Sequence, residues 1–184
     1  MASMSIKTHA HGQEPPSDWV ASWTPRIAPR GKVLDLACGI GRHSRFLAAR
    51  GFRVCAVDRD STALDALDGV EGVSVRQADL ENGPWPLDGL VFDAIVVTNY
   101  LHRPLFPHIL GAIAPAGMLI YETFAAGNER FGKPSNPDFL LRPGELLDLV
   151  RGRLRVIAYE DFEVAAPRPA CIQRICAAKV RDEA

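Results

Sequence analysis

Residues 33–43 read Val-Leu-Asp-Leu-Ala-Cys-Gly-Ile-Gly-Arg-His, and this stretch predicts how the chain folds. Its apolar start, interrupted only by Asp35, is typical of a short buried strand. Gly39 and Gly41 follow two residues apart and lead into a helical pattern. A glycine pair where a strand turns into a helix lets the backbone approach a ligand closely, because glycine has no Cβ. The stretch therefore predicts a strand, a ligand-binding turn and a helix, in that order.

A second predicted strand, Phe52-Arg-Val-Cys-Ala-Val-Asp58, ends on an acid. A carboxylate at this point of a parallel sheet accepts hydrogen bonds from the two hydroxyls of a ribose. We therefore expect Asp58 to bind a nucleoside, with Arg59 beside it. Asp35 lies just below the glycine turn, where a carboxylate can hold the ammonium group of an amino-acid tail. The alternative is that Asp35 only ties down loop amides, because an unpaired buried charge is costly.

Ser44 helps to distinguish a single-nucleoside ligand from a dinucleotide. The dinucleotide fingerprint has a third glycine three residues beyond the second, where it allows close helix packing. Ser44 occupies that position in this chain. A nicotinamide-dependent oxidoreductase is therefore the least favoured of the nucleotide-binding interpretations.

Val33 to Gly41 resembles motif I of the class I S-adenosylmethionine (SAM)-dependent methyltransferases, a strand followed by Asp-x-x-x-Gly-x-Gly. The resemblance includes Asp58 and extends over about half of the chain. It continues through three later runs, Gln77-Ala-Asp-Leu80, Phe92-Asp-Ala-Ile-Val-Val-Thr-Asn-Tyr100 and Leu110-Gly-Ala-Ile-Ala-Pro-Ala-Gly-Met-Leu-Ile120. The run from Cys38 to Arg50 is also similar to small tellurite-resistance-type methyltransferases.

The resemblance implies S-adenosyl-L-methionine as the cofactor. In such a site Asp79 would accept a hydrogen bond from the adenine amino group, with the Leu80 amide nearby. The alternative is that Asp79 forms a turn before Glu81-Asn82-Gly83. The residues that we expect to bind the cofactor are Asp35, Ala37, Gly39, Gly41, Asp58, Arg59, Asp79, Leu80 and Asn99.

Strand and helix patterns alternate along most of the chain, which indicates a parallel sheet with helices on both faces. We expect strands at 32–37, 52–58, 72–77, 92–98 and 117–124. Helices are expected at 42–50, 60–68, 104–114 and 143–150. The β-rich segments 153–161 and 171–179 have no helix between them and are expected to form a closing hairpin.

Together with the resemblance, this order predicts an α/β, Rossmann-like doubly wound fold. Its sheet would be mostly parallel and seven-stranded, with a reversed seventh strand. Residues 1–14 are expected to be a disordered N-terminus, and 15–184 a single SAM-binding domain. The pattern breaks in 81–89, where two prolines and two glycines argue against a helix. It breaks again in 125–142, a long connection of the kind that often carries function.

Asn99 and Tyr100 end the fourth strand, where the resemblance places the transferred methyl group. Some relatives carry Pro-Pro-Tyr here, and its absence disfavours the subclasses that methylate DNA bases or protein glutamine. We take His102 and Tyr100 as the candidate catalytic residues, because an oxygen acceptor needs a general base and histidine is the side chain that most often serves as one. His102 and Arg103 could instead cap the following helix or lie on the surface.

The amino-acid composition limits the kinds of partner that the protein is expected to bind. The 21 Lys+Arg and 22 Asp+Glu give a net charge of −1 and no electrostatic basis for nucleic-acid binding. The four cysteines include no Cys-x-x-Cys pair, which favours reduced, packed thiols and no metal site. His9 and His11 are expected to be incidental to a frayed terminus. No segment approaches the length of a membrane span or forms a signal sequence, so we expect a cytoplasmic enzyme without a membrane partner.

These observations favour a SAM-dependent methyltransferase that acts on a small-molecule acceptor by in-line methyl transfer. One alternative is a methyltransferase with a protein or RNA acceptor, which would need a docking surface. Another is a non-catalytic SAM-binding or regulatory module that retains Gly39, Gly41 and Asp58 but lacks an acceptor pocket. The sequence leaves the methyl acceptor and the oligomeric state open.

Overall fold

The computed structural model describes residues 14–166 and 168–180. The expected disordered terminus therefore falls, except for Glu14, outside the described residues, and so do His9 and His11.

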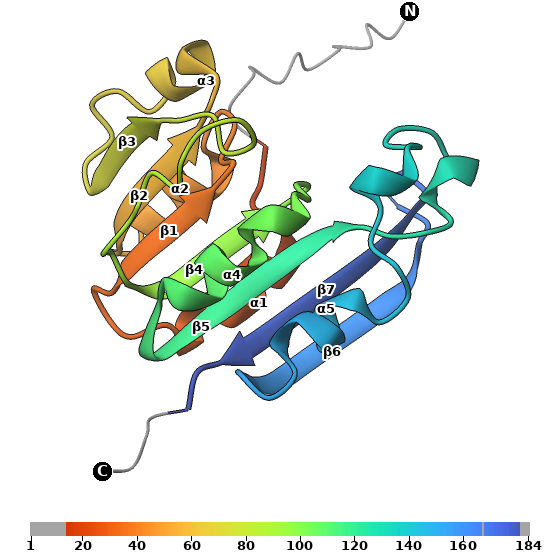
Figure 1. Ribbon diagram of the computed structural model, residues 1–184. Coiled ribbons are helices and arrows are strands. Elements are labelled where there is room, and N and C mark those ends of the chain that lie inside the picture. Colours follow the sequence, from red (N-terminus) through yellow and green to blue (C-terminus); the bar gives the residue numbers. More distant parts are fainter. Residues whose placement is uncertain (1–13, 167, 181–184) are drawn as a thin grey trace, which may run out of the picture.

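A seven-stranded sheet with the strand order β3-β2-β1-β4-β5-β7-β6 forms the centre of the molecule (Figure 1). Strands β1 to β5 are parallel, and β7 runs antiparallel to both β5 and β6. This confirms the predicted α/β sheet with its reversed seventh strand. The strands are β1 (Lys32–Leu36), β2 (Arg53–Asp58), β3 (Val73–Gln77), β4 (Phe92–Thr98), β5 (Ile113–Phe124), β6 (Arg155–Val164) and β7 (Ala170–Ala178).

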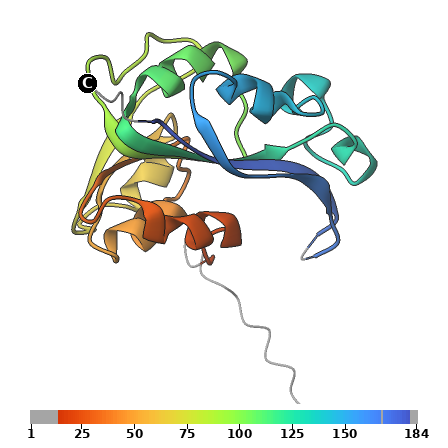
Figure 2. The same cartoon turned by 90° about the horizontal axis from the view of Figure 1, so that it is seen from below.

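Helices cover both faces of the sheet. Figure 2 shows α4 and α5 on one face and α1 and α2 on the other. The helices are α1 (Asp18–Trp23), α2 (Arg42–Ala48), α3 (Ser61–Asp65), α4 (Phe106–Gly111) and α5 (Glu145–Val150). Because both faces are covered, β1 and β4 are almost continuous runs of buried residues, as is typical of central parallel strands.

The helix expected at 104–114 is shorter and begins differently. A 3-10 turn, η2 (Arg103–Leu105), comes first, and α4 ends at Gly111. Pro104 and Pro107 lie in the first turns of these two elements, where a residue without an N–H is tolerated. Strand β5 then begins at Ile113, earlier than expected. A register shift against β4 between Phe92 and Ala94 accommodates the extra residues.

The two edge strands of the sheet differ from its centre. No helix connects β3 to β4, as the prolines and glycines of 81–89 predict. Residues 74–77 of β3 are therefore solvent-exposed. Strand β6 forms the other edge and exposes the acidic stretch Glu160–Glu163. Both edges thus carry polar side chains, whereas the central strands carry apolar ones.

Within residues 14–166 and 168–180, no helix is long and apolar enough to cross a membrane. The same residues contain no group of three or more His, Cys, Asp or Glu side chains arranged to hold a metal ion.

Candidate cofactor-binding site

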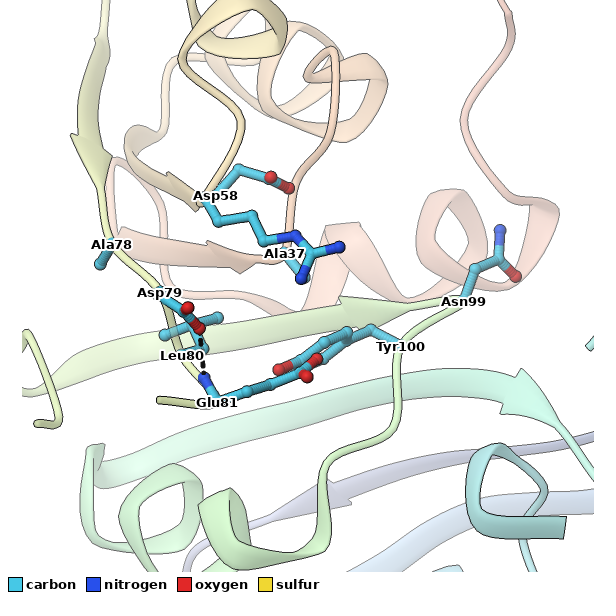
Figure 3. Close-up of a pocket in the computed structure, with 9 residues that line it drawn as sticks. Ala37, Asp58, Ala78, Asp79, Leu80, Glu81, Asn99 and Tyr100 are labelled. Atoms are coloured by element: carbon cyan, nitrogen blue, oxygen red, sulfur yellow. Dashed lines mark hydrogen bonds between the residues drawn. The ribbon is translucent and has the colours of Figure 1, made fainter. Parts of the chain in front are cut away.

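A cavity of about 260 Å³ opens at the carboxyl ends of β1, β2, β3 and β4. This is the position where open α/β sheets bind their ligands. Figure 3 shows side chains from these strand ends and from the turn after β3 converging on it. The cavity is lined by Ala37, Asp58, Arg59, Ala78, Asp79, Leu80, Glu81, Asn99 and Tyr100.

The turn between β1 and α2 has the geometry that its glycines predict. Gly39 and Gly41 have φ values of +53° and +76°, in the left-handed region that favours glycine. A Cβ on Gly39 would meet no atom within 4 Å, whereas one on Gly41 would overlap the side chain of Leu67. Gly39 therefore keeps space open beside the turn, and Gly41 allows the turn to pack against Leu67, two residues beyond the end of α3.

Asp58 connects the end of β2 to the glycine turn. One of its oxygens accepts the N–H of Gly39 at 2.7 Å, and the other accepts the N–H of Asp60 at 3.0 Å. These two bonds fix the carboxylate at the cavity wall. Because each carboxylate oxygen can accept a second hydrogen bond, Asp58 can still accept bonds from a ribose.

Asp35 is buried beneath the turn and does not line the cavity. Its carboxylate accepts a 2.6 Å hydrogen bond from the Ser44 hydroxyl. Burial raises the pKa of Asp35 to about 6, although the bonds from Ser44 and the charge of Arg42 act against this shift. The structure thus shows a bond that holds β1 to α2, close to the tethering alternative. Binding of a ligand ammonium by Asp35 stays a prediction.

Asp79 both lines the cavity and shapes the turn after β3. Its carboxylate accepts bonds from the N–H of Glu81 at 2.9 Å and of Asn82 at 3.1 Å, and from the Asn82 side-chain amide at 3.0 Å. These bonds lower the pKa of Asp79, with the Asn82 side chain contributing most. The turn-forming role is therefore present, and contact with an adenine stays a prediction.

Asn99 and Tyr100 form the side of the cavity at the end of β4. Asn99 has a φ of +54°, and its N–H bonds to the carbonyl of Glu122 at 2.9 Å. The hydroxyl of Tyr121 donates to the Tyr100 carbonyl at 2.8 Å. Two bonds from β5 thus fix the backbone where the fourth strand ends.

The Tyr100 ring extends across the cavity toward Glu81 (Figure 3). Its hydroxyl oxygen is buried without a hydrogen-bond partner among the described residues. Burial, followed by the nearby Glu81 and Asp79 carboxylates, raises the pKa of Tyr100 above its usual value. Tyr100 therefore stays protonated at neutral pH and can donate a hydrogen bond, but it cannot serve as a base there.

His102 and Arg103 lie outside the cavity. His102 is the residue that precedes η2, and its carbonyl accepts the N–H of Leu105 at 3.0 Å. Arg103 makes bonds of 2.6 and 2.8 Å to the two carboxylate oxygens of Glu145 and also donates to the carbonyls of Asp138 and Leu140. Arg103 thus fastens the end of the 125–142 connection to α5. Participation of His102 in catalysis stays a prediction.

Of the residues expected to bind the cofactor, the structure brings six to the cavity, together with Tyr100. Gly39 and Gly41 shape the adjoining turn. Sequence reasoning missed Ala78 and Glu81, which lie on either side of the Asp79-Leu80 pair. The turn signal in 81–89 places this chain reversal next to β3, and that signal could have indicated them.

Comparisons with known proteins agree with this geometry. Residues 33–116 match the family model described as a methyltransferase domain. The curated protein YqeM of Bacillus subtilis (strain 168), which carries a methyltransferase name, is 29% identical over 125 residues, covering 60% of this chain and 50% of YqeM. The chain therefore spans about half the length of this relative.

Solved structures share the fold at low sequence identity. TehB from Haemophilus influenzae superposes with a TM-score of 0.72 at 20% identity, over 89% of this chain and 62% of TehB. A TehB-like SAM-dependent methyltransferase from Corynebacterium glutamicum gives 0.64 at 22% identity, over 89% of each chain. A 1,6-didemethyltoxoflavin-N1-methyltransferase from Burkholderia thailandensis, solved with S-adenosylhomocysteine, gives 0.64 at 18% identity over 89% of this chain and 77% of that one. Residues 33–116 are thus similar to a methyltransferase domain, and the described chain shares its fold with solved SAM-dependent methyltransferases.

Proposed function

We propose that this chain transfers the methyl group of SAM to a small-molecule acceptor. The observation that carries the proposal is the cavity at the carboxyl ends of β1–β4, where Asp58 stands beside the glycine turn. The cavity has a volume of about 260 Å³ and leaves room for a nucleoside. Ser44 favours a single nucleoside over a dinucleotide, because its hydroxyl bonds to Asp35 at a position where the dinucleotide fingerprint has glycine.

The cavity fits the chemistry of SAM. Asp58 offers acceptor oxygens to the ribose hydroxyls, and the turn held by Asp79 borders the same space. Ala37, Ala78 and Leu80 supply apolar surface for a flat base. The buried Tyr100 hydroxyl makes no hydrogen bond of good geometry among the described residues and lies near the Glu81 carboxylate, so it can donate to an acceptor atom of a ligand.

When bound, SAM supplies a methyl group on a sulfonium that is already an activated leaving group. The protein then needs mainly to align the acceptor and exclude water, and such alignment contributes several kcal/mol of rate enhancement. Asn99 and Tyr100 are suited to this role, since β5 fixes their backbone on the cavity wall. A thiol or another soft nucleophile would need no base. For an oxygen acceptor, we propose His102 as the base.

Two observations support a small acceptor over a protein or RNA. The net charge of −1 offers no general attraction for nucleic acid. Among the structures with this fold, the Burkholderia methyltransferase was solved with 1,6-didemethyltoxoflavin bound. This comparison supports the size class of the acceptor and leaves its identity to experiment.

Calorimetric titration with SAM, S-adenosylhomocysteine and NAD tests the cofactor. We expect binding of both sulfur nucleosides and none of NAD. Binding of NAD alone would overturn the assignment. A screen of thiol, amine and hydroxyl compounds, followed by mass spectrometry for a gain of one methyl group, then tests transfer. Tight SAM binding with no turnover on small acceptors, but turnover on a protein or RNA fraction, would contradict the small-acceptor proposal.

A further inference from the structure

His43 is a buried polar residue that the cofactor cavity does not account for. It lies in the first turn of α2, directly after the glycine turn, and is 2% exposed. Its Nε2 accepts the backbone N–H of Ser17 at 3.1 Å, and its Nδ1 lies 3.4 Å from the hydroxyl of Thr98. Because Nε2 acts as an acceptor, the ring proton belongs on Nδ1, from which it points to Thr98.

The imidazole remains neutral in the folded protein. Burial, with a smaller contribution from the charge of Arg42, lowers the pKa of His43 to about 3. A protonated imidazole has no acceptor atom and could not take the N–H of Ser17. The hydrogen bond to Ser17 therefore persists throughout the pH range of ordinary enzyme work.

Ser17 is held by a second side chain as well. Its hydroxyl donates to Glu122 at 2.7 Å and accepts the N–H of Trp19 at 3.1 Å, which caps α1. Glu122 in turn pairs with Arg174 at 3.5 Å, and the Arg174 guanidinium lies over the ring of Trp19. Ser17 is thus joined to α2 through its backbone and to β5 through its side chain.

The partners of Ser17 belong to the elements that shape the cavity. His43 follows the glycine turn, and Thr98 directly precedes Asn99 on the cavity wall. The carbonyl of Glu122 accepts the N–H of Asn99 at 2.9 Å. A displacement of Ser17 would therefore disturb the glycine turn and the ends of β4 and β5 together.

We propose that His43 is a positioning residue that fastens the segment in front of α1, residues 14–17, across the carboxyl ends of β4 and β5, and that this fastening is coupled to cofactor binding. The coupling rests on the proposed SAM-binding function, whereas the fastening does not. Thermodynamic linkage makes the coupling reciprocal: a bound nucleoside should hold the segment more firmly, and a loosened segment should weaken the nucleoside. Couplings of this kind commonly change affinity by about 5- to 150-fold.

Substitutions at His43 can test the Nε2 contact with Ser17 separately from the Nδ1 contact with Thr98. We expect His43→Ala to weaken S-adenosylhomocysteine binding by about 5- to 30-fold, within the common range of coupling. The amides of Asp18–Trp23 should also exchange with deuterium faster. His43→Gln should restore most of both properties, because its carboxamide oxygen reaches the place of Nε2. The shorter side chain of His43→Asn can replace only the Nδ1 contact, so this variant should behave like His43→Ala.

Ser17 offers an independent matched pair. Its φ of −56° lies close to the value that proline imposes, so Ser17→Pro removes the N–H donor without forcing the backbone to change. Ser17→Ala keeps the N–H and loses only the hydroxyl. Both variants lose the bond to Glu122, and therefore the additional loss of affinity in Ser17→Pro measures the bond to His43. Equal affinities in the two variants would contradict the role of that bond.

Val20→Ala is the control for general loosening of α1. The Val20 side chain is fully buried in the same helix and makes none of these polar contacts, and its backbone N–H, which also bonds to the Ser17 hydroxyl at 3.5 Å, is retained in the variant. The variant should therefore lower the melting temperature and leave the affinity for S-adenosylhomocysteine unchanged. An equal loss of affinity in Val20→Ala and His43→Ala would overturn the coupling. Failure of the unaltered protein to bind S-adenosylhomocysteine would overturn the proposed function and the coupling together. Unchanged amide exchange in His43→Ala would overturn the fastening itself.

Discussion

The carboxyl ends of β1–β3 and those of β4–β5 use polar residues in opposite ways. At the first group, Asp58 retains acceptor capacity toward an open cavity, and Gly39 has empty space where a Cβ would be. At the second group, His43 and Glu122 bond to Ser17, a residue of the same chain. A ligand-binding region must leave hydrogen-bonding capacity unused, as Asp58 does and as the Tyr100 hydroxyl after β4 also does, whereas the contacts around Ser17 gain stability by using it. Substitutions in the two regions should therefore change different measured quantities.

The two glycines of the turn give the largest expected contrast. Gly41→Ala forces a Cβ into Leu67 at a φ of +76°, so we expect a loss of about 2–4 kcal/mol in the free energy of unfolding from strain and overpacking. Gly39→Ala meets no atom of the protein and should cost only about 1 kcal/mol of stability. It should weaken SAM binding by about tenfold or more, because the added methyl group takes up ligand space at a cost of at least 1.4 kcal/mol. Urea denaturation and calorimetry on both variants measure the two effects. A reversal of these effects would contradict the assignment of the open space to the ligand.

Removal of Arg103 tests a supporting contact that lies outside the cavity. Arg103→Ala breaks a two-point bond to the nearly buried Glu145 and two bonds to loop carbonyls. Because Arg103 is partly exposed and solvent screens the pair, we expect about 2 kcal/mol of destabilisation, less than for a fully buried pair. Arg151→Ala removes a solvent-exposed pair with Asp148 and serves as the control, with an expected cost of about 0.5 kcal/mol or less. Equal melting temperatures of the two variants would show that Arg103 does not fasten the loop.

Asp58 provides the corresponding test on the ligand side. Asp58→Ala should weaken SAM binding by about 1–3 kcal/mol through the loss of charged hydrogen bonds. The matched variant Asp60→Ala removes the cap of α3 and should reduce stability by about 1 kcal/mol without changing SAM affinity. Calorimetry on both variants distinguishes the two roles. Unchanged affinity in Asp58→Ala would exclude this carboxylate from the binding site.

The buried side chains of His43 on α2 and Asp35 on β1 should make the stability of the fold depend on pH in opposite directions. Burial lowers the pKa of His43 from 6.5 to about 3, so below pH 6.5 only the unfolded chain gains this proton, and acidification destabilises the fold. Burial raises the pKa of Asp35 from 3.8 to about 6, so between these values the folded state binds the proton first, and acidification stabilises the fold. Each effect has a slope of up to about 1.4 kcal/mol per pH unit.

Variants at these two positions separate the opposing slopes. His43→Gln should lose less stability than the unaltered protein between pH 7 and pH 5, by about 1 kcal/mol or more. Asp35→Asn should lose more over the same interval, because the compensating gain disappears. Urea denaturation at pH 7, 6 and 5 provides the comparison. Parallel stability curves for all three proteins would contradict the opposing protonation of these residues.

Periodicity and glycine placement were enough to predict the order of strands and helices in this fold. They were less informative where proline placement and strand register decide the structure, as in 104–114. There, Pro104 and Pro107 divide the expected helix, and Ile113 already belongs to β5. Whether residues 113–116 belong to the helix or to the strand depends on the pairing of Ile113 with Phe92, which a local pattern does not contain.

Sequence patterns predicted those residues of the candidate site that lie at the ends of strands. Asp58 and Asn99 end predicted strands, and both line the cavity. Asp35 accepts a hydrogen bond from Ser44, and its binding of a ligand ammonium group stays a prediction, because a buried carboxylate with either role has the same sequence signature. His43 gave no usable signal, since its partner Ser17 lies 26 residues away in the sequence.

The two edge strands of the sheet also influence what the protein can do at high concentration. An exposed edge is a template onto which another chain can add a strand, and charged side chains on the edge oppose such addition. Strand β3 is only five residues long and carries Arg76, and β6 carries Glu160, Asp161 and Glu163 in close succession. On both edges, charged side chains thus lie next to the exposed apolar residues Val75, Val156 and Phe162, where they should oppose the addition of a further strand.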